Sequence, residues 1–188
     1  TSTAPPLSAT TTASTGTGSP LVMQIIAGCA LAHLVNDLIQ AVLPSIYPIL
    51  KASYGLSFTQ IGLITLTFQL TASLLQPWVG YHTDRHPKPW LLPVGSICTL
   101  VGIIMLAFVG SFGAILLASA LVGIGSSTFH PEASRIARLA SGGRFGLAQS
   151  TFQVGGNAGS AFGPLLAAAI IIPYGQTHTA WFLSLIHI

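Results

Sequence analysis

The chain has 188 residues, of which 51% are hydrophobic and only 5% are charged, and six basic against three acidic side chains give a formal net charge of +3. A soluble domain usually carries about 25% charged residues, so a water-soluble fold could not cover its surface with so few charges. This composition argues against a soluble enzyme, a nucleic-acid-binding protein and a disordered chain, and it predicts an integral, all-α membrane protein.

The N-terminal segment and the remainder of the chain are predicted to differ. Residues 1–20 are mostly Thr, Ser, Ala, Pro and Gly and cannot bury a core, so we expect a disordered polar tail. Residues 21–188 contain long uncharged runs, and about 20 apolar residues suffice to cross a bilayer. They predict an N-terminal bundle of about five to six transmembrane helices, incomplete at the sixth. The full spans are expected at residues 21–46, 57–79, 90–109, 114–129 and 145–172, and a sixth helix is expected to begin near residue 179.

A capping-box pattern marks the start of the second span. Ser57 and Gln60 have the S-x-x-Q spacing in which each side chain bonds to the backbone of the other residue. The pattern predicts that the helix begins at Ser57.

The basic residues are divided unequally between the two sides of the predicted bundle. Because successive spans cross in opposite directions, segments 80–89 and 130–144 lie on the same side of the membrane. They hold five of the six basic side chains, whereas the opposite segments hold only Lys51. Positively charged loops stay in the cytoplasm, so both segments and the N-terminus are expected there. The five residues are Arg85, Lys88, Arg135, Arg138 and Arg144.

Asp37 is an acidic residue in the middle of the first span, next to Asn36. A carboxylate at this depth costs roughly 2.5–3.5 kcal/mol and normally faces a polar cavity or a partner. His33 lies four residues earlier, on the same helical face, so the two side chains could exchange a proton. The alternatives are a hydrogen bond that only packs helices, or a shorter span that leaves both groups near the membrane boundary.

The segment between the second and third spans is short and polar. Gly80 allows the chain to turn, and Asp84 can cap a helix or pair with a cation of another helix. Arg85 and Lys88 would hold the segment on the cytoplasmic side. The simplest alternative is an ordinary charged turn.

At the end of the fourth span, Glu132 and Arg135 are three residues apart and can pair. We interpret them as an interfacial ion pair; the alternative gives His130 or Glu132 a role in proton coupling or gating.

The fifth span combines small residues with a polar stripe. Gly159 and Gly163 allow close contact with a neighbouring helix, and Pro164 bends the span. Polar side chains recur every four residues, and they either line a substrate path or hold helices together. The stripe consists of Gln149, Gln153 and Asn157.

Two of these segments resemble signatures of the major facilitator superfamily. Its loop between spans two and three has a Gly, then Asp-Arg after three residues, then a basic residue, and Gly80, Asp84, Arg85 and Lys88 fit. His82, Thr83 and Pro87 depart from the usual residues. Gly159, Gly163 and Pro164 resemble the span-five motif of the antiporters, although Ala167 replaces its last Gly. Ser119 stands where many antiporters carry an Arg, which moves the expected proton chemistry to Asp37 and His33.

Segments 33–37, 81–87, 129–132 and 153–159 together resemble the fosmidomycin resistance branch of this superfamily. The resemblance implies the N-terminal half of a two-half transporter in the bacterial inner membrane, which exports a small anionic antibiotic in exchange for protons. The implied partners are the substrate, protons, the lipid bilayer and the missing C-terminal half, without nucleic acid, metal or other cofactor.

Two other functions stay open. One is an importer of sugars or organic anions with the same fold. The other is a membrane enzyme that uses His33, Asp37, His130 and Glu132 as metal ligands or acid–base groups, although no HExxH spacing supports it. We therefore expect a transporter and not an enzyme.

Overall fold

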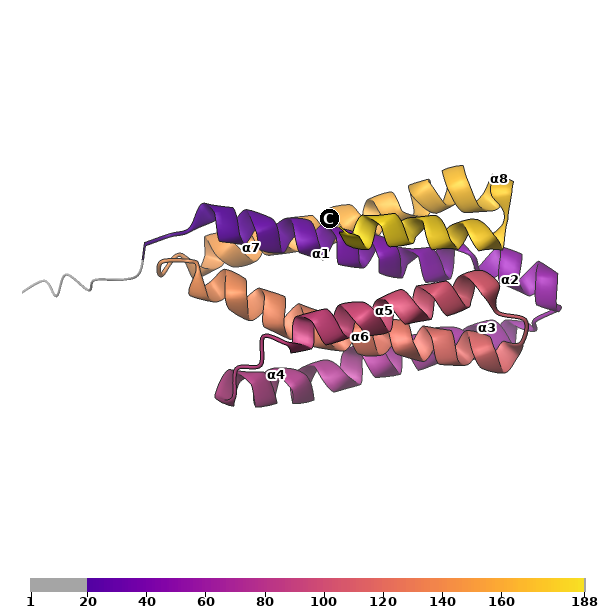
Figure 1. Cartoon of the computed structure of the whole chain (residues 1–188), viewed down its shortest axis with the longest axis horizontal. Coiled ribbons are helices and arrows are strands. Elements are labelled where there is room, and N and C mark those ends of the chain that lie inside the picture. The colour runs from indigo at the N-terminus through magenta and orange to yellow at the C-terminus, as the bar shows by residue number, and fades with distance from the viewer. Residues whose placement is uncertain (1–19, 188) are drawn as a thin grey trace, which may run out of the picture.

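The computed structural model describes the backbone of residues 20–187 and the side chains of residues 20–181, so the predicted tail of residues 1–20 lies almost entirely outside the described residues. The described chain is a bundle of long helices without a strand (Figure 1). Five helical segments are long and apolar enough to cross a membrane, which confirms the predicted all-α membrane fold. They are Met23–Tyr54, Phe58–Arg85, Leu91–Phe108, Phe112–Leu139 and Phe145–Tyr174.

The first span is longer than predicted. Helix α1, Met23–Ser45, is followed after Ile46 by α2, Tyr47–Tyr54. The predicted end at residue 46 agrees with Ile46 as the cap of α1. The chain then continues as α2 because Pro48 lies in the first turn of that helix, where its missing N–H has no intrahelical partner to lose. Gly55 ends α2 in a left-handed conformation with φ of 60°.

The second span begins at the predicted cap and ends later than expected. The Ser57 hydroxyl accepts from the Gln60 N–H at 3.2 Å, and the Gln60 side chain accepts from the Ser57 N–H at 2.9 Å. The span comprises α3, Phe58–Gln69, the π-helix η1, Leu70–Leu74, and α4, Leu75–Arg85. Residues 80–85 are therefore helical, and the prediction of a loop from residue 80 was wrong.

The fourth span also extends beyond its predicted end at residue 129, whereas the third span matches its predicted bounds closely. Helix α5 is Leu91–Phe108, and α6 is Phe112–Leu139. The Ser111 hydroxyl caps α6 by accepting from the Ala114 N–H at 3.3 Å. The predicted polar segment 130–144 is thus mostly helix, because polar side chains mark the edge of the bilayer and do not interrupt helical hydrogen bonds.

The fifth span is α7, Phe145–Leu166, the π-helix η2, Ala167–Ile171, and α8, Ile172–Tyr174, close to its prediction. A 3-10 helix, η3, then covers Gln176–His187, where the sixth helix was expected to begin.

Both π-helices lie just before a proline. Pro77 follows η1 and Pro173 follows η2 within three residues. A proline inside a helix lacks an N–H donor, and its ring collides with the carbonyl four residues earlier. The wider π turn relieves this conflict and allows each span to continue.

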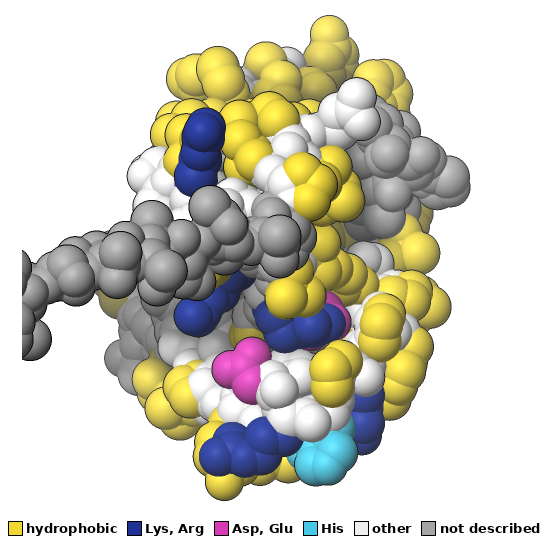
Figure 2. All heavy atoms as spheres, turned by 90° about the vertical axis from the view of Figure 1, so that its left-hand side faces the viewer, with side chains coloured by type: hydrophobic (Ala, Val, Ile, Leu, Met, Phe, Trp, Pro, Cys, Tyr) yellow, Lys and Arg dark blue, Asp and Glu magenta, His cyan; other side chains and the backbone are white. Residues whose placement is uncertain are grey.

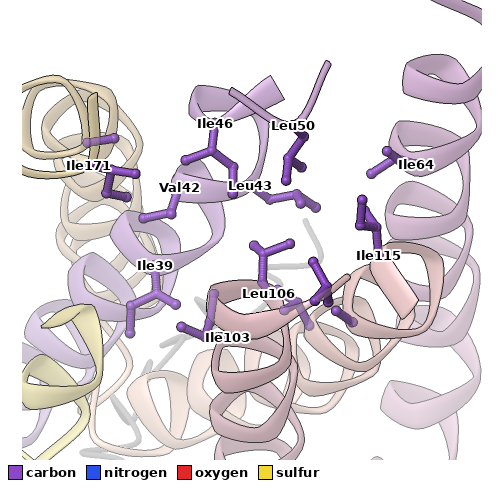
Figure 3. Close-up of a cluster of buried hydrophobic side chains, with 14 of the residues drawn as sticks. Ile39, Val42, Leu43, Ile46, Leu50, Ile64, Ile103, Leu106, Ile115 and Ile171 are labelled. Atoms are coloured by element: carbon purple, nitrogen blue, oxygen red, sulfur yellow. The ribbon is translucent and has the colours of Figure 1, made fainter. Parts of the chain in front are cut away.

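The largest of the buried apolar clusters lies at one end of the bundle. Helix α1 packs most extensively on α7, and α5 packs on α6. Side chains of α1 and α2 meet those of α3, α5, α6 and η2 in a continuous apolar cluster (Figure 3). The labelled members are Ile39, Val42, Leu43, Ile46, Leu50, Ile64, Ile103, Leu106, Ile115 and Ile171.

The opposite end of the bundle carries most of the charge. There α4 and α6 end while α1 and α7 begin, and Lys and Arg side chains gather on this face (Figure 2). Lys51, by contrast, lies on α2 at the far end.

The contact between α1 and α7 generates a stability prediction. A Cβ at Gly159 would run into the main chain of Leu34 and Leu38 on α1. Gly159→Leu should therefore lower the free energy of unfolding of the protein by about 1–3 kcal/mol, measured by denaturant titration in detergent micelles. Gly62→Ala is the matched control, because a Cβ at Gly62 meets nothing within 4 Å. Equal stability of the two variants would contradict this close packing.

Candidate functional site

Asp37 points into the helix bundle between two histidines. One of its oxygens, Oδ2, lies 3.3 Å from Nε2 of His33, and the other, Oδ1, lies 3.0 Å from Nε2 of His130. The Asp37 side chain is 19% exposed, so it is neither fully sealed nor free in solvent. The Asp37 carboxylate therefore faces two histidines inside the bundle, which favours the interpretation that it borders a polar cavity over exposure to the hydrocarbon of the bilayer.

The two histidines reach Asp37 from different helices. His33 lies on α1 four residues before Asp37, as the helical spacing predicted. His130 comes from α6, and sequence reasoning missed its place beside Asp37 because the fourth span was expected to end at residue 129. Once α6 continues to Leu139, His130 lies well inside the helix.

Main-chain carbonyl groups fix the orientation of both imidazole rings. Nδ1 of His33 lies 2.9 Å from the carbonyl oxygen of Phe152, and Nδ1 of His130 lies 2.9 Å from that of Ser126. A carbonyl oxygen only accepts hydrogen bonds, so each Nδ1 donates and carries a proton. Each Nε2 is thereby left facing the carboxylate of Asp37.

The ring of His33 is held in a tight slot against α7. It stacks on the Phe152 ring with centroids 4.0 Å apart and is 2% exposed. A Cβ at Gly156 would overlap the imidazole, so only glycine leaves room for it there. Sequence reasoning treated this glycine-rich segment as a packing surface and missed its part in placing His33.

Two amides complete the surroundings of the carboxylate. Asn36 donates to Oδ1 of Asp37 at 3.1 Å, which places this candidate residue at the site. Gln40 donates to the same oxygen at 3.5 Å. Gln40 lies one turn after Asn36 on α1, so its helical spacing is a signal that could have found it.

Two adjoining cavities open beside the site, with volumes of about 340 and about 630 Å³. Both are lined by Asp37 and His130, and the larger also by His33 and Gln153. Ser73 and Gln76 from the second span line both. The cluster thus borders space that water or a small solute could enter.

His33, Asp37 and His130 also have ligand atoms within 4.8 Å of one another, close enough to surround one metal ion. Glu132, the fourth residue of the enzyme alternative, does not join them. Glu132 is fully buried and pairs with Arg135, whose Nε lies 3.0 Å from its Oε2, while Arg135 Nη2 bonds to Oε1. The proposed four-residue enzyme site therefore does not assemble among the described residues.

The charged residues near the ends of α4 and α6 form a separate group. Asp84 on α4 is exposed and acts electrostatically on Arg135 of α6. Arg85 instead stays on its own helix: its guanidinium lies 3.6 Å from the centroid of the Tyr81 ring, and it donates to the Tyr81 carbonyl at 3.2 Å. Lys88 is half-buried in the turn after α4. Gly80 approaches Pro131 of α6, where a Cβ would lie 3.6 Å from the proline side chain.

The predicted residues of α7 separate into two roles. Gly159 and Gly163 contact the main chain of α1, and Pro164 lies inside α7 near its end. Gln153 faces the larger cavity, whereas Gln149 donates to the Ser134 hydroxyl at 2.6 Å and Asn157 is exposed. The polar stripe therefore combines a residue that lines the cavity with one that links α7 to α6.

Comparison with known proteins agrees with this architecture. Residues 29–188 match the family model described as Major Facilitator Superfamily. The chain is 63% identical over 158 residues to the fosmidomycin resistance protein of Escherichia coli strain K12, an alignment that covers 84% of this chain and 39% of that relative.

A second relative is the uncharacterized MFS-type transporter YfnC of Bacillus subtilis strain 168. It is 46% identical over 179 residues, covering 95% of this chain and 43% of the relative. The chain thus spans about two fifths of the length of these two relatives. With the family match, the helical spans and the shared sequence taken together, the chain belongs to the major facilitator superfamily.

Proposed function

We propose that this chain is the N-terminal half of a proton-driven exporter of a small antibiotic of the fosmidomycin type. The observation that carries the proposal is the Asp37 carboxylate, held between His33 and His130 beside two cavities. Identity to a fosmidomycin resistance protein supports the substrate class. The match to only 39% of that relative supports a missing C-terminal half.

In the proposed mechanism, protonation of the Asp37 cluster drives the exchange. Transporters of this kind alternate access by rocking one half against the other around a central site. A proton on the cluster changes its net charge, and a change in net charge alters the relative free energies of the two access states. Protons from outside and substrate from the cytoplasm would therefore occupy the site alternately. Gln153, which lines the larger cavity, would lie on the substrate path.

Residues at the charged end would close the cytoplasmic side. Asp84 on α4 attracts Arg135 on α6, which in turn holds the buried Glu132. The attraction between Asp84 and Arg135 acts between two spans and would stabilise the outward-facing state. Arg85 and Lys88 would anchor the same end at the anionic surface of the inner leaflet.

The charge distribution supports the proposed orientation. The basic residues of segments 80–89 and 130–144 lie at one end of the bundle, which we assign to the cytoplasm together with the N-terminus (Figure 2). The membrane would then be the bacterial inner membrane.

An importer with the same fold is the main alternative. The antiporter-like residues Gly159, Gly163 and Pro164 favour export, because the motif they resemble is associated with exchange. Direction is tested in everted vesicles with fosmidomycin as the probe: an exporter accumulates it when the lumen is acidic, whereas an importer loses it.

Asp37→Asn is expected to abolish transport in these vesicles, with accumulation near the level of membranes that lack the transporter. The amide keeps the shape of the carboxylate but cannot hold a proton in exchange with the histidines. Resistance of cells that express the full-length variant should fall in parallel at unchanged expression.

Ser96→Ala is the control for Asp37→Asn, since within the described part of the chain its hydroxyl bonds only to the Leu92 carbonyl on its own helix. Undiminished, gradient-dependent accumulation by Asp37→Asn would remove Asp37 from the mechanism.

The cytoplasmic closure predicts coupling between Asp84 and Arg135. Asp84→Asn and Arg135→Gln should each shift the full-length transporter toward the inward-facing state, and their combined effect should be less than additive by at most about 1 kcal/mol, because Asp84 is exposed. Distances between spin labels at the cytoplasmic ends of the two halves measure the populations. Fully additive effects would mean that the two side chains act separately.

A further inference from the structure

We propose that His33, Asp37 and His130 hold two exchangeable protons as one unit, one at each histidine Nε2. The proton on His130 exchanges directly with water, whereas the proton on His33 is buried. The use of these protons in transport rests on the proton-driven function proposed above. The protons themselves are inferred from the geometry of the cluster.

The first step is that the Nδ1 protons are not the exchangeable ones. Both Nδ1 atoms lie 2.9 Å from main-chain carbonyl oxygens, of Phe152 and of Ser126. The Ser126 hydroxyl also lies 3.2 Å from Nδ1 of His130 and can donate or accept. The carbonyl oxygens have no proton to give, so deprotonation at either Nδ1 would leave it facing another acceptor, the nearer carbonyl oxygen. The exchangeable position on each ring is therefore Nε2.

The second step is that each Nε2 faces its own carboxylate oxygen. The distances are 3.3 Å from His33 to Oδ2 and 3.0 Å from His130 to Oδ1 of Asp37. Nitrogen and oxygen lone pairs repel at such distances unless a proton lies between them, so each contact needs one. Two protons between the three groups give the cluster a net charge of +1.

The third step concerns the neighbours of the cluster. The described residues that line the two cavities include no charged or titratable side chain other than these three. On α6, Glu132 and Arg135 satisfy each other, and Asp84 acts on Arg135 from α4. The two amides that reach Asp37 donate to Oδ1 and add no charge. The charge of the cluster is therefore set by its own protons.

The fourth step is the asymmetry between the histidines. His33 is 2% exposed, is fixed between Phe152 and the slot at Gly156, and borders only the larger cavity. The His130 side chain is 22% exposed and borders both cavities. A proton on His130 can pass directly to water in the cavity. A proton on His33 leaves by way of the Asp37 carboxylate and His130.

Loss of the protons would also loosen a helix contact. With the His130 proton gone, the Nε2 lone pair faces Oδ1 of Asp37 and the attraction between α6 and α1 becomes repulsion. The ring is then free to turn toward the cavity. The proton state is thus linked to the separation of two spans that belong to the same half of the transporter.

Nitrogen NMR of the full-length transporter in lipid nanodiscs, labelled with 15N-histidine, tests the proposal. His33 and His130 should both be imidazolium at acid pH and should both become the neutral Nδ1–H form on alkaline titration. The Nε2 proton of His130 should exchange with water faster than that of His33. Signals are assigned by their loss in His130→Gln and His33→Gln, with His86→Gln, in the turn after α4, as the matched control.

The outcomes separate the two proposals. A neutral Nε2–H form on either ring, or a charge change on only one of them between about pH 5 and pH 9, overturns the two-proton unit. If His33→Gln does not fold, the wild-type spectrum at alkaline pH still tests the two-proton unit. Once the His130 signals are assigned, the number of histidine rings in the neutral Nδ1–H form shows whether a second ring behaves like His130. If both rings behave as expected but fosmidomycin transport is unchanged by an imposed pH gradient, the two-proton unit is supported and the proton-driven function is contradicted.

Discussion

A buried carboxylate in a membrane span must have partners, and the position of Asp37 depends on this constraint. Removing a carboxylate from water costs far more than one neutral hydrogen bond returns, so the charge needs opposite charge, protons or several donors. Two imidazoles and two amides supply them from α1 and α6. The same contacts that make Asp37 tolerable at this depth leave its protonation dependent on two histidines, and that dependence is what a proton-coupled transporter can use.

The packing of α1 against α7 provides the geometry for this arrangement. Glycines on α7 let the two main chains approach closely, and at Gly156 the missing side chain admits the imidazole of His33. The close contact brings the Phe152 carbonyl to Nδ1 and so selects which nitrogen faces Asp37. Residues that look like a packing motif in the sequence therefore also determine the chemistry of the site.

The sequence was informative where the interaction is local. The capping box at Ser57 and the four-residue spacing of His33 and Asp37 follow from helical periodicity, and the structure confirms both contacts. The ends of α4 at Arg85 and α6 at Leu139 were not predicted, because loss of hydropathy locates the edge of a bilayer and not the end of a helix. The contact of His130 with Asp37 could not be foreseen either, since it depends on how α6 packs against α1.

The most direct test of proton coupling at Asp37 is the movement of protons that accompanies substrate. In proteoliposomes that contain the full-length transporter and no imposed pH gradient, an outward gradient of fosmidomycin should drive protons inward, measured with a trapped pH-sensitive dye. Asp37→Asn should lose this proton flux. Substrate movement through the wild-type protein without any accompanying proton flux would contradict a coupling role for the carboxylate and its two histidines.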